Sequence, residues 1–179
     1  MRILAKLFFT FSFLLIANFT RCQVPEYQKI QLKDFFASAD EKANNAVWRT
    51  DYYICTGIAY AKSIGKTPSD FAVFVGNHHS WEGIKGQGLE PAVQILNAVI
   101  KLYENSTFEI TSESDSLVTM LSNRPYKVYF ENDQMLGVSV GEFESCLWGH
   151  IKILAERIGL NFNYKIEGNQ IVSSLAIKK

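Results

Sequence analysis

A cysteine and a histidine lie four residues apart in the second half of the chain, and they have the clearest capacity for chemistry. Between Ser139 and Ile158 apolar side chains recur at steps of three and four residues, which predicts an amphipathic helix with Cys146 and His150 on its buried face. An imidazole beside a thiol can activate it as a nucleophile. The pair is therefore the candidate catalytic group. The alternatives are polar groups of a ligand pocket, or a small buried thiol and a histidine bonded to a backbone carbonyl.

A second polar region lies at the end of another predicted helix. Thr67 is a typical N-cap, and Pro68 suits the first helical position. Phe71 and Phe74 recur at helical spacing, and their face continues to His78. We therefore expect His78 to point into the core.

The candidate ligand-binding residues lie at the end of this helix and at the start of the glycine-containing loop after it. They are His78, His79, Trp81 and Glu82. A tryptophan and a carboxylate in a flexible loop can line a pocket, or the tryptophan can cover the core while the carboxylate is solvated. If both helices cover the same sheet, His78 and His150 approach one another and can contact one ligand.

A metal site is a further hypothesis for the same residues, and the sequence names no cofactor. Thiolate and imidazole are ligands that suit zinc or copper, so His78, Cys146 and His150 supply three of the usual four. The fourth ligand would be His79, Glu82 or Glu142.

Charge and composition exclude two classes of partner. The chain has 18 Lys and Arg residues and 18 Asp and Glu residues, so it lacks the positive excess that binding to nucleic acid or to an anionic membrane requires. With 47% hydrophobic and 13% aromatic residues, the composition is that of a folded protein. A small-molecule ligand fits this composition, and the oligomeric state is left open.

An export signal is predicted for residues 1–22. Two basic residues precede an uninterrupted apolar run from Leu7 to Ala17, which is too short to span a bilayer as a stable helix. We expect cleavage before Gln23, which would leave residues 23–179 as a single periplasmic or secreted α+β domain with no membrane span. Acylation of Cys22 in a lipoprotein is the alternative.

The first half of this domain is predicted to be helical, and the second half to mix helix and strand. Cys55 is expected to face inward, and a disulfide between Cys55 and Cys146 is left open, while Asp51 and Arg124 are interpreted as surface charges. The expected helices cover about 29–47, 48–64, 89–104 and 139–158, with a further helix from Ser112, a strand at 107–111 and a weaker strand pattern at 126–130.

The two C-terminal strands carry the most specific tertiary prediction. Apolar residues alternate with polar ones on both sides of a Gly168-Asn169 turn. A two-residue turn pairs Glu167 with Gln170 and Ile166 with Ile171, which puts the alternating apolar sets that contain Leu160, Ile166, Ile171 and Ile177 on one face. The fold class expected is therefore α+β, with a helical layer packed on a small sheet that includes a C-terminal β-hairpin.

The C-terminal half also resembles a known enzyme family. From Thr107-Phe-Glu-Ile-Thr, through the helix with Cys146 and His150, to the strands at 160–177, the order of elements is similar to that of the L-2-amino-thiazoline-4-carboxylic acid hydrolase family. The resemblance implies an α+β domain with a small-molecule site between sheet and helices, and hydrolysis of a cyclic C–N bond.

Three functions are compatible with these observations. The leading hypothesis is an exported domain that binds a small molecule. The second is a hydrolase that acts on a small cyclic C–N substrate through Cys146 and His150 or through a metal. The third is a structural or protein-interaction module, which an exposed apolar patch would favour.

Overall fold

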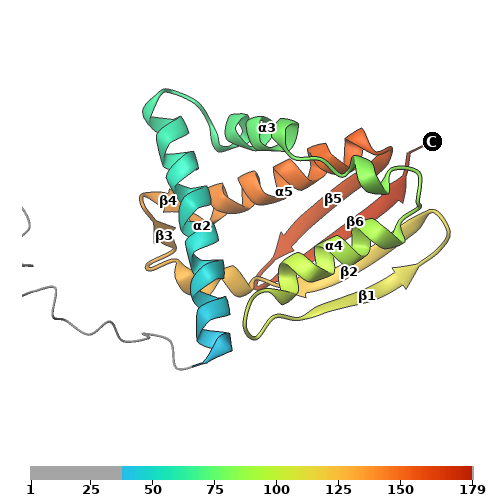
Figure 1. The fold of residues 1–179 in the computed structure, drawn as a ribbon, viewed down its shortest axis with the longest axis horizontal. Coiled ribbons are helices and arrows are strands. Elements are labelled where there is room, and N and C mark those ends of the chain that lie inside the picture. Colours follow the sequence, from blue (N-terminus) through green and yellow to red (C-terminus); the bar gives the residue numbers. More distant parts are fainter. Residues whose placement is uncertain (1–37, 179) are drawn as a thin grey trace, which may run out of the picture. The chain divides into compact units, whose positions relative to one another are not determined.

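The computed structural model describes residues 38–178 (Figure 1). The fold is α+β, as predicted from the sequence: helices pack on an antiparallel sheet that includes the C-terminal hairpin. The helices are α2 (Ala39–Ser63), α3 (Pro68–His78), α4 (Glu90–Lys101) and α5 (Val140–Arg157), with the 3-10 helices η2 (Glu82–Ile84) and η3 (Pro125–Tyr129). The strands are β1 (Phe108–Glu113), β2 (Leu117–Asn123), β3 (Gln134–Met135), β4 (Val138–Ser139), β5 (Leu160–Glu167) and β6 (Gln170–Ile177).

The predicted export signal, its cleavage point and Cys22 lie outside the described residues. Within residues 38–178, no helix combines the length and the apolar character needed to cross a membrane.

The main sheet has the strand order β1-β2-β6-β5, and every neighbouring pair is antiparallel. The register of the β5–β6 hairpin is the predicted one. Glu167 pairs with Gln170 beside the turn, and Leu160 pairs with Ile177 at the far end. Gly168 has a φ of 61°, a left-handed conformation that glycine adopts without strain. The two-residue turn at Gly168-Asn169 therefore determines the register of the hairpin.

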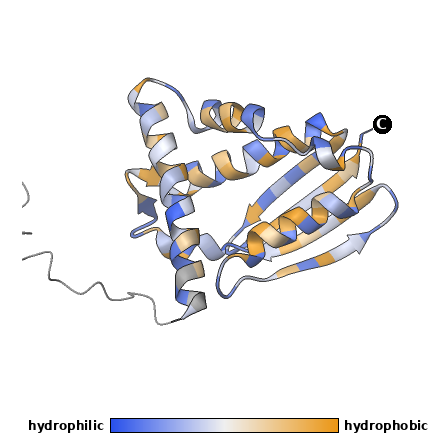
Figure 2. Ribbon diagram, viewed as in Figure 1, coloured by the Kyte–Doolittle hydropathy of each residue, from blue (hydrophilic) through white to orange (hydrophobic). Residues whose placement is uncertain are grey.

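One face of the sheet is covered by helices, and the other carries polar side chains along β5. In Figure 1, α4 and α5 lie over the same face of the sheet. The hydropathy colouring of Figure 2 shows hydrophobic residues along α4 and along the strands behind it. On β5, Phe162 is buried on the inner face while Asn163 is exposed on the outer one. The largest fully buried side chains of the described residues include Tyr126, Phe143, Phe162, Ile58, Ile100 and Met120.

Helix α2 is one continuous helix, where two had been predicted with a boundary at residue 48. Its start is marked by a capping box: the Glu41 amide donates to Ser38 Oγ, and the Ser38 amide donates to the Glu41 carboxylate. No glycine or proline interrupts the chain near Trp48, so nothing ends a helix there. The predicted boundary at residue 48 was therefore wrong.

Strand β1 confirms the strand predicted at 107–111, whereas β2 replaces the helix that was predicted from Ser112. Leu117, Val118 and Leu121 also fit helical spacing, but β2 pairs with β1 on one side and with β6 on the other. Burial then alternates along β2, with Val118 and Met120 inside. Pairing with a distant strand decides such a short apolar segment, because local preference alone is weak. The weak strand pattern at 126–130 is likewise the 3-10 helix η3.

Helix α3 packs on α5 through its smallest residues, so its predicted inward face was wrong. Ala72 and Gly76 are its buried positions, whereas Phe74 and His78 are exposed. A Cβ at Gly76 would lie 3.0 Å from the Cβ of Ile153 on α5. The two backbones therefore approach too closely for large side chains between them, and these turn outward.

Candidate functional site

The histidine that meets His150 is His79, not His78. Their rings lie edge to face with centroids 5.8 Å apart. His79 is the C-cap of α3, and Arg157 of α5 donates from Nη1 to the carbonyls of Gly76 and His79, which ties the end of α3 to α5. His150 Nδ1 donates to the Leu147 carbonyl at 2.9 Å, which leaves Nε2 as the acceptor nitrogen of the neutral ring.

His78 lies apart from this pair, on the exposed side of α3. Its Nδ1 donates to the Phe74 carbonyl at 2.7 Å, and its ring packs on the Phe74 ring at a centroid distance of 4.4 Å. The prediction that His78 approaches His150 was therefore wrong, because its neighbour His79 makes this contact instead. The reason is local: His78 is the last helical residue, whereas His79 has extended backbone angles that send its side chain in another direction.

Cys146 is buried beside this region as a protonated thiol. Burial raises the pKa of Cys146 to about 11, and the pKa of the buried Cys55 is raised to about 12, chiefly by burial. Both cysteines face inward, as predicted for each, and both are free. No hydrogen bond joins Cys146 to His150 among the described residues. A cysteine nucleophile is activated by a lowered thiol pKa and by a hydrogen bond to a base, and Cys146 shows neither in the described chain.

Trp81 and Glu82 lie in different environments. Trp81 precedes η2 and packs against the core, while Glu82 is exposed and pairs with Lys85 at 3.4 Å. Within residues 38–178, no three His, Cys, Asp or Glu side chains gather closely enough to hold a metal ion. The predicted residues therefore do not gather into a metal site in this part of the chain.

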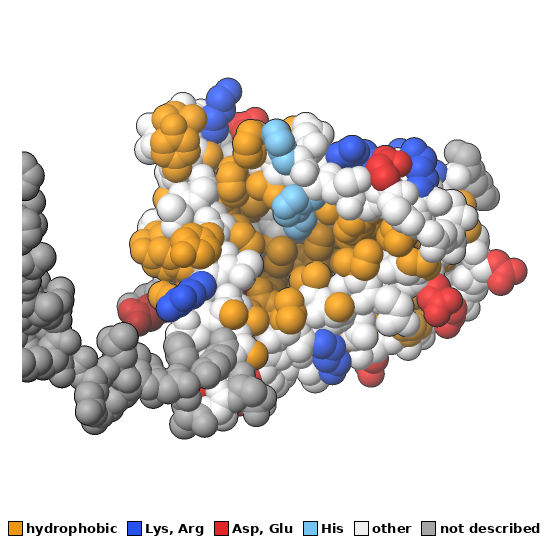
Figure 3. Space-filling view, viewed as in Figure 1, with side chains coloured by type: hydrophobic (Ala, Val, Ile, Leu, Met, Phe, Trp, Pro, Cys, Tyr) orange, Lys and Arg blue, Asp and Glu red, His pale blue; other side chains and the backbone are white. Residues whose placement is uncertain are grey.

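Apolar side chains are exposed on the face that carries the histidines. Figure 3 shows a hollow with apolar walls between α2 and α4, and histidine side chains at its edge over α3 and α5. Exposed apolar surface also continues along the outer sides of α2 and α3, which includes Tyr60 at 66% and Phe74 at 59% exposure. Apolar side chains therefore make up much of the surface seen in this view.

An apolar pocket of about 490 Å³ lies between the C-terminal half of α2 and α3, and we call it the α2–α3 pocket. Its floor forms where the Phe71 ring lies directly on Gly57, a position where any Cβ would overlap the ring. Its remaining lining residues are Tyr60, Ala61, Ile64, Lys66, Asp70, Val73 and Phe74.

The two charged residues at this pocket, Asp70 and Lys66, differ in their contacts with the rest of the protein. Asp70 accepts hydrogen bonds from the Thr67 amide and hydroxyl, and the backbone bond in particular lowers the pKa of its carboxyl. Lys66 forms no ion pair with a carboxylate of the described chain. The charge of Lys66 also contributes to lowering the pKa of Asp70, but no ion pair within residues 38–178 holds its ammonium group, which can therefore contact a ligand.

Two buried carboxylates form a site that the sequence analysis missed. Asp51 is 1% exposed, and Tyr103 donates to its Oδ1 at 2.8 Å, while no group of the described chain bonds to Oδ2. Burial raises the pKa of Asp51 to about 7. The interpretation of Asp51 as a surface charge was wrong. A signal existed, because Val47, Asp51, Cys55 and Ile58 form one helical stripe that is buried.

Glu144 is the second buried carboxylate, at 2% exposure. Arg124 donates to it from Nε at 2.6 Å and from Nη2 at 2.9 Å, and Tyr126 donates from its hydroxyl at 2.7 Å. Arg124, also predicted as a surface charge, is therefore a partly buried residue that pairs with Glu144. The Tyr103 and Tyr126 rings pack edge to face at 5.9 Å and connect the two carboxylates. Asp51, Tyr103, Tyr126, Arg124 and Glu144 form what we call the carboxylate–tyrosine cluster.

No protein-family model, curated protein or solved structure matches this chain. Conclusions about function therefore rest on the geometry of these sites.

Proposed function

We propose that this domain binds a small molecule with an apolar body and an anionic group in the α2–α3 pocket. The observation that carries the proposal is the pocket itself: about 490 Å³ of apolar-walled space, open to solvent. This volume is within the range of small-molecule sites, which are typically mostly apolar with a few polar groups.

The exposed aromatic groups at the pocket support a ligand with an apolar body. Tyr60 and Phe74 leave more than half of their surfaces in water, on facing helices. Large apolar groups gathered at one surface gain free energy when a ligand covers them. His78 packs against Phe74 and extends this surface, so it is the predicted site residue closest to the proposed ligand.

The charge at the pocket favours an anionic ligand group. Asp70 is engaged by Thr67, and Lys66 has no ion-pair partner within the described chain. A carboxylate or sulfonate of the ligand would gain a charge-assisted contact with Lys66. An amine in the same place would be repelled.

A hydrolase that uses Cys146 and His150 has less support. A thiol with a pKa of about 11 is protonated near neutral pH, and the imidazole hydrogen on Nδ1 is already donated to a backbone carbonyl. We further propose, from the apolar run at Leu7 to Ala17, that the domain is exported and binds its ligand in the periplasm or outside the cell.

The proposal is tested with 1-anilinonaphthalene-8-sulfonate, a fluorescent probe with an aromatic body and one sulfonate. We expect saturable binding at one site, weakened about tenfold by Phe74→Ser and severalfold by Lys66→Glu. The control is Leu102→Ser, which removes a similarly exposed apolar side chain at the C-cap of α4, outside the lining of this pocket, and should leave binding unchanged.

Equal binding by the Phe74→Ser and Leu102→Ser variants would refute this pocket as the site, as would the absence of saturable binding by wild type. Native mass spectrometry of protein from its own host adds an independent measurement. An additional mass that is retained by wild type and lost from the Phe74→Ser variant would identify the natural ligand.

A further inference from the structure

Strand β1 is an edge of the main sheet, with a free side that could accept another strand. Among the described residues it pairs only with β2, and the strand order places nothing beyond it. The free amides and carbonyls of an edge strand can pair with an extended segment of another chain. A bulge between Ile110 and Ser112 divides the edge into two short segments. Any added strand would therefore be short.

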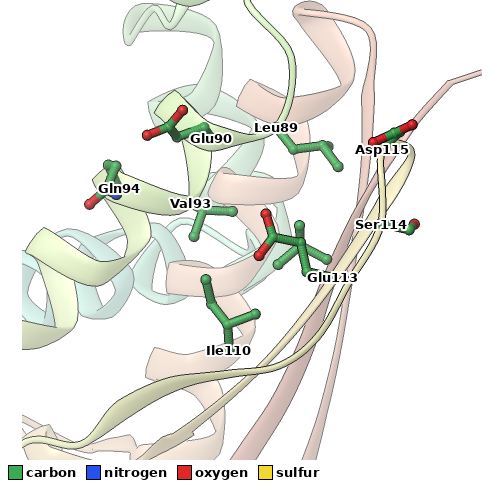
Figure 4. A pocket seen from close by; sticks show the side chains of 9 residues that line it. Leu89, Glu90, Val93, Gln94, Ile110, Glu113, Ser114 and Asp115 are labelled. Atoms are coloured by element: carbon green, nitrogen blue, oxygen red, sulfur yellow. The ribbon is translucent and has the colours of Figure 1, made fainter.

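A cavity opens between this strand and helix α4, and we call it the α4–β1 groove. Its volume is about 640 Å³. Figure 4 shows Val93 from the helix and Ile110 and Glu113 from the strand directed into the same space. The remaining lining residues are Leu89, Glu90, Gln94, Ser114, Asp115 and Val118.

The floor of the groove includes an apolar side chain that points to the core face of the sheet but remains partly exposed. Ile110 pairs with Met120 and lies on the same face of the sheet, but Met120 is fully buried whereas Ile110 is 48% exposed. Leu89 and Val93 of α4 supply the opposite apolar wall. The groove thus has room for an apolar side chain from an added strand, because alternate side chains of that strand would point under α4.

The rim of the groove is negatively charged. Glu90, Glu113 and Asp115 surround the apolar floor, and no Lys or Arg of the described chain forms an ion pair with any of them. A cationic partner would gain favourable electrostatic contacts with these carboxylates. The charge of the rim therefore selects a basic partner.

We propose that the free edge of β1 and the α4–β1 groove bind an extended basic segment of a partner protein by strand addition. Backbone hydrogen bonds to β1 hold the segment, one of its apolar side chains enters the groove against Val93 and Ile110, and a Lys or Arg two positions along the segment, which points to the same face, pairs with Glu113. This interaction surface is separate from the α2–α3 pocket.

The test uses a synthetic eight-residue peptide with blocked ends and the sequence Thr-Val-Thr-Lys-Thr-Val-Thr-Lys, whose valine and lysine side chains share one face of an extended strand. We expect saturable binding by fluorescence polarisation, weakening with salt, and slower hydrogen exchange of β1 amides in the complex. Glu113→Lys should weaken binding about tenfold. Glu109→Lys makes the same charge change on the same strand, but Glu109 pairs with Leu121 on the opposite face, so binding should change less than about twofold.

Three outcomes would overturn the proposal. Equal losses in the two lysine variants would indicate attraction by net charge alone. Unchanged affinity of the same peptide after N-methylation of alternate backbone amides would exclude strand pairing. Displacement of the peptide by 1,5-diaminopentane at equal affinity would show that the groove binds small cations. Unaltered melting temperatures of both variants establish that each remains folded.

Discussion

The imidazoles of His79 and His150 meet edge to face at 5.8 Å, where the end of α3 lies on the middle of α5. His150 is partly buried, and burial is the main cause that lowers its pKa from 6.5, with a further lowering from His79 and an opposing effect of the bond to the Leu147 carbonyl. Burial therefore favours the neutral form of the His150 ring.

Replacing His79 with Gln should raise the pKa of His150 slightly and leave it below 6.5. The substitution removes the lesser cause and keeps the larger one, which is burial. An NMR titration of the histidine ring carbons measures this directly. A wild-type His150 pKa at or above 6.5 would contradict the burial of this ring.

Asp51 should make the stability of the protein depend on pH. Its pKa is about 7 in the folded protein and 3.8 ordinarily, so the folded state binds the proton more tightly. The free energy of unfolding therefore falls as pH rises from about 4 to about 7, by at most about 1.4 kcal/mol per pH unit from this group, and levels off above that range. Urea denaturation across this range should show that Asp51→Asn removes this part of the slope. The exposed control Asp115→Asn should retain it.

Removing Arg124 should destabilise the protein severely, because Glu144 would remain buried without its charged partner. We expect Arg124→Met to cost about 3–5 kcal/mol. The matched control is Lys165→Met, which breaks the exposed ion pair of Lys165 with Glu167 and should leave the melting temperature close to that of wild type. Similar melting temperatures for the two variants would show that the buried pair is not required.

The hairpin register predicts opposite effects for two lysine substitutions on β6. Ile171 is fully buried on the inner face, whereas Ser174 lies on the outer face and is partly exposed. Ile171→Lys should cost about 3 kcal/mol or more, and Ser174→Lys less than about 1 kcal/mol. Thermal denaturation distinguishes them, and equal melting temperatures would mean that the faces are reversed.

The export signal predicts a mature protein that begins at Gln23. The apolar run from Leu7 to Ala17 is long enough to engage the export machinery and too short to anchor the chain. N-terminal sequencing of exported protein checks this. Material that begins at Met1, or a lipid mass on Cys22, would refute it.

The sequence by itself determined the elements whose causes are local. Thr67 and Ser139 begin α3 and α5 through side-chain caps that involve residues three positions away. Glycine at 168 defines the hairpin turn, and through it the pairing of Glu167 with Gln170 and of every residue behind them. Such interactions can be read along the chain because both partners are close in sequence.

Only the tertiary structure decided what each element packs against. Residues 117–123 form a strand because β6, some fifty residues later, lies beside them. Close contact with α5 turned Ala72 and Gly76 inward on α3 and left His78 outside. Asp51 could be buried only because Tyr103, from a different part of the chain, supplies its hydrogen bond. Periodicity shows that a segment has an apolar face, but packing density and polar partners from distant segments select the residues that are enclosed.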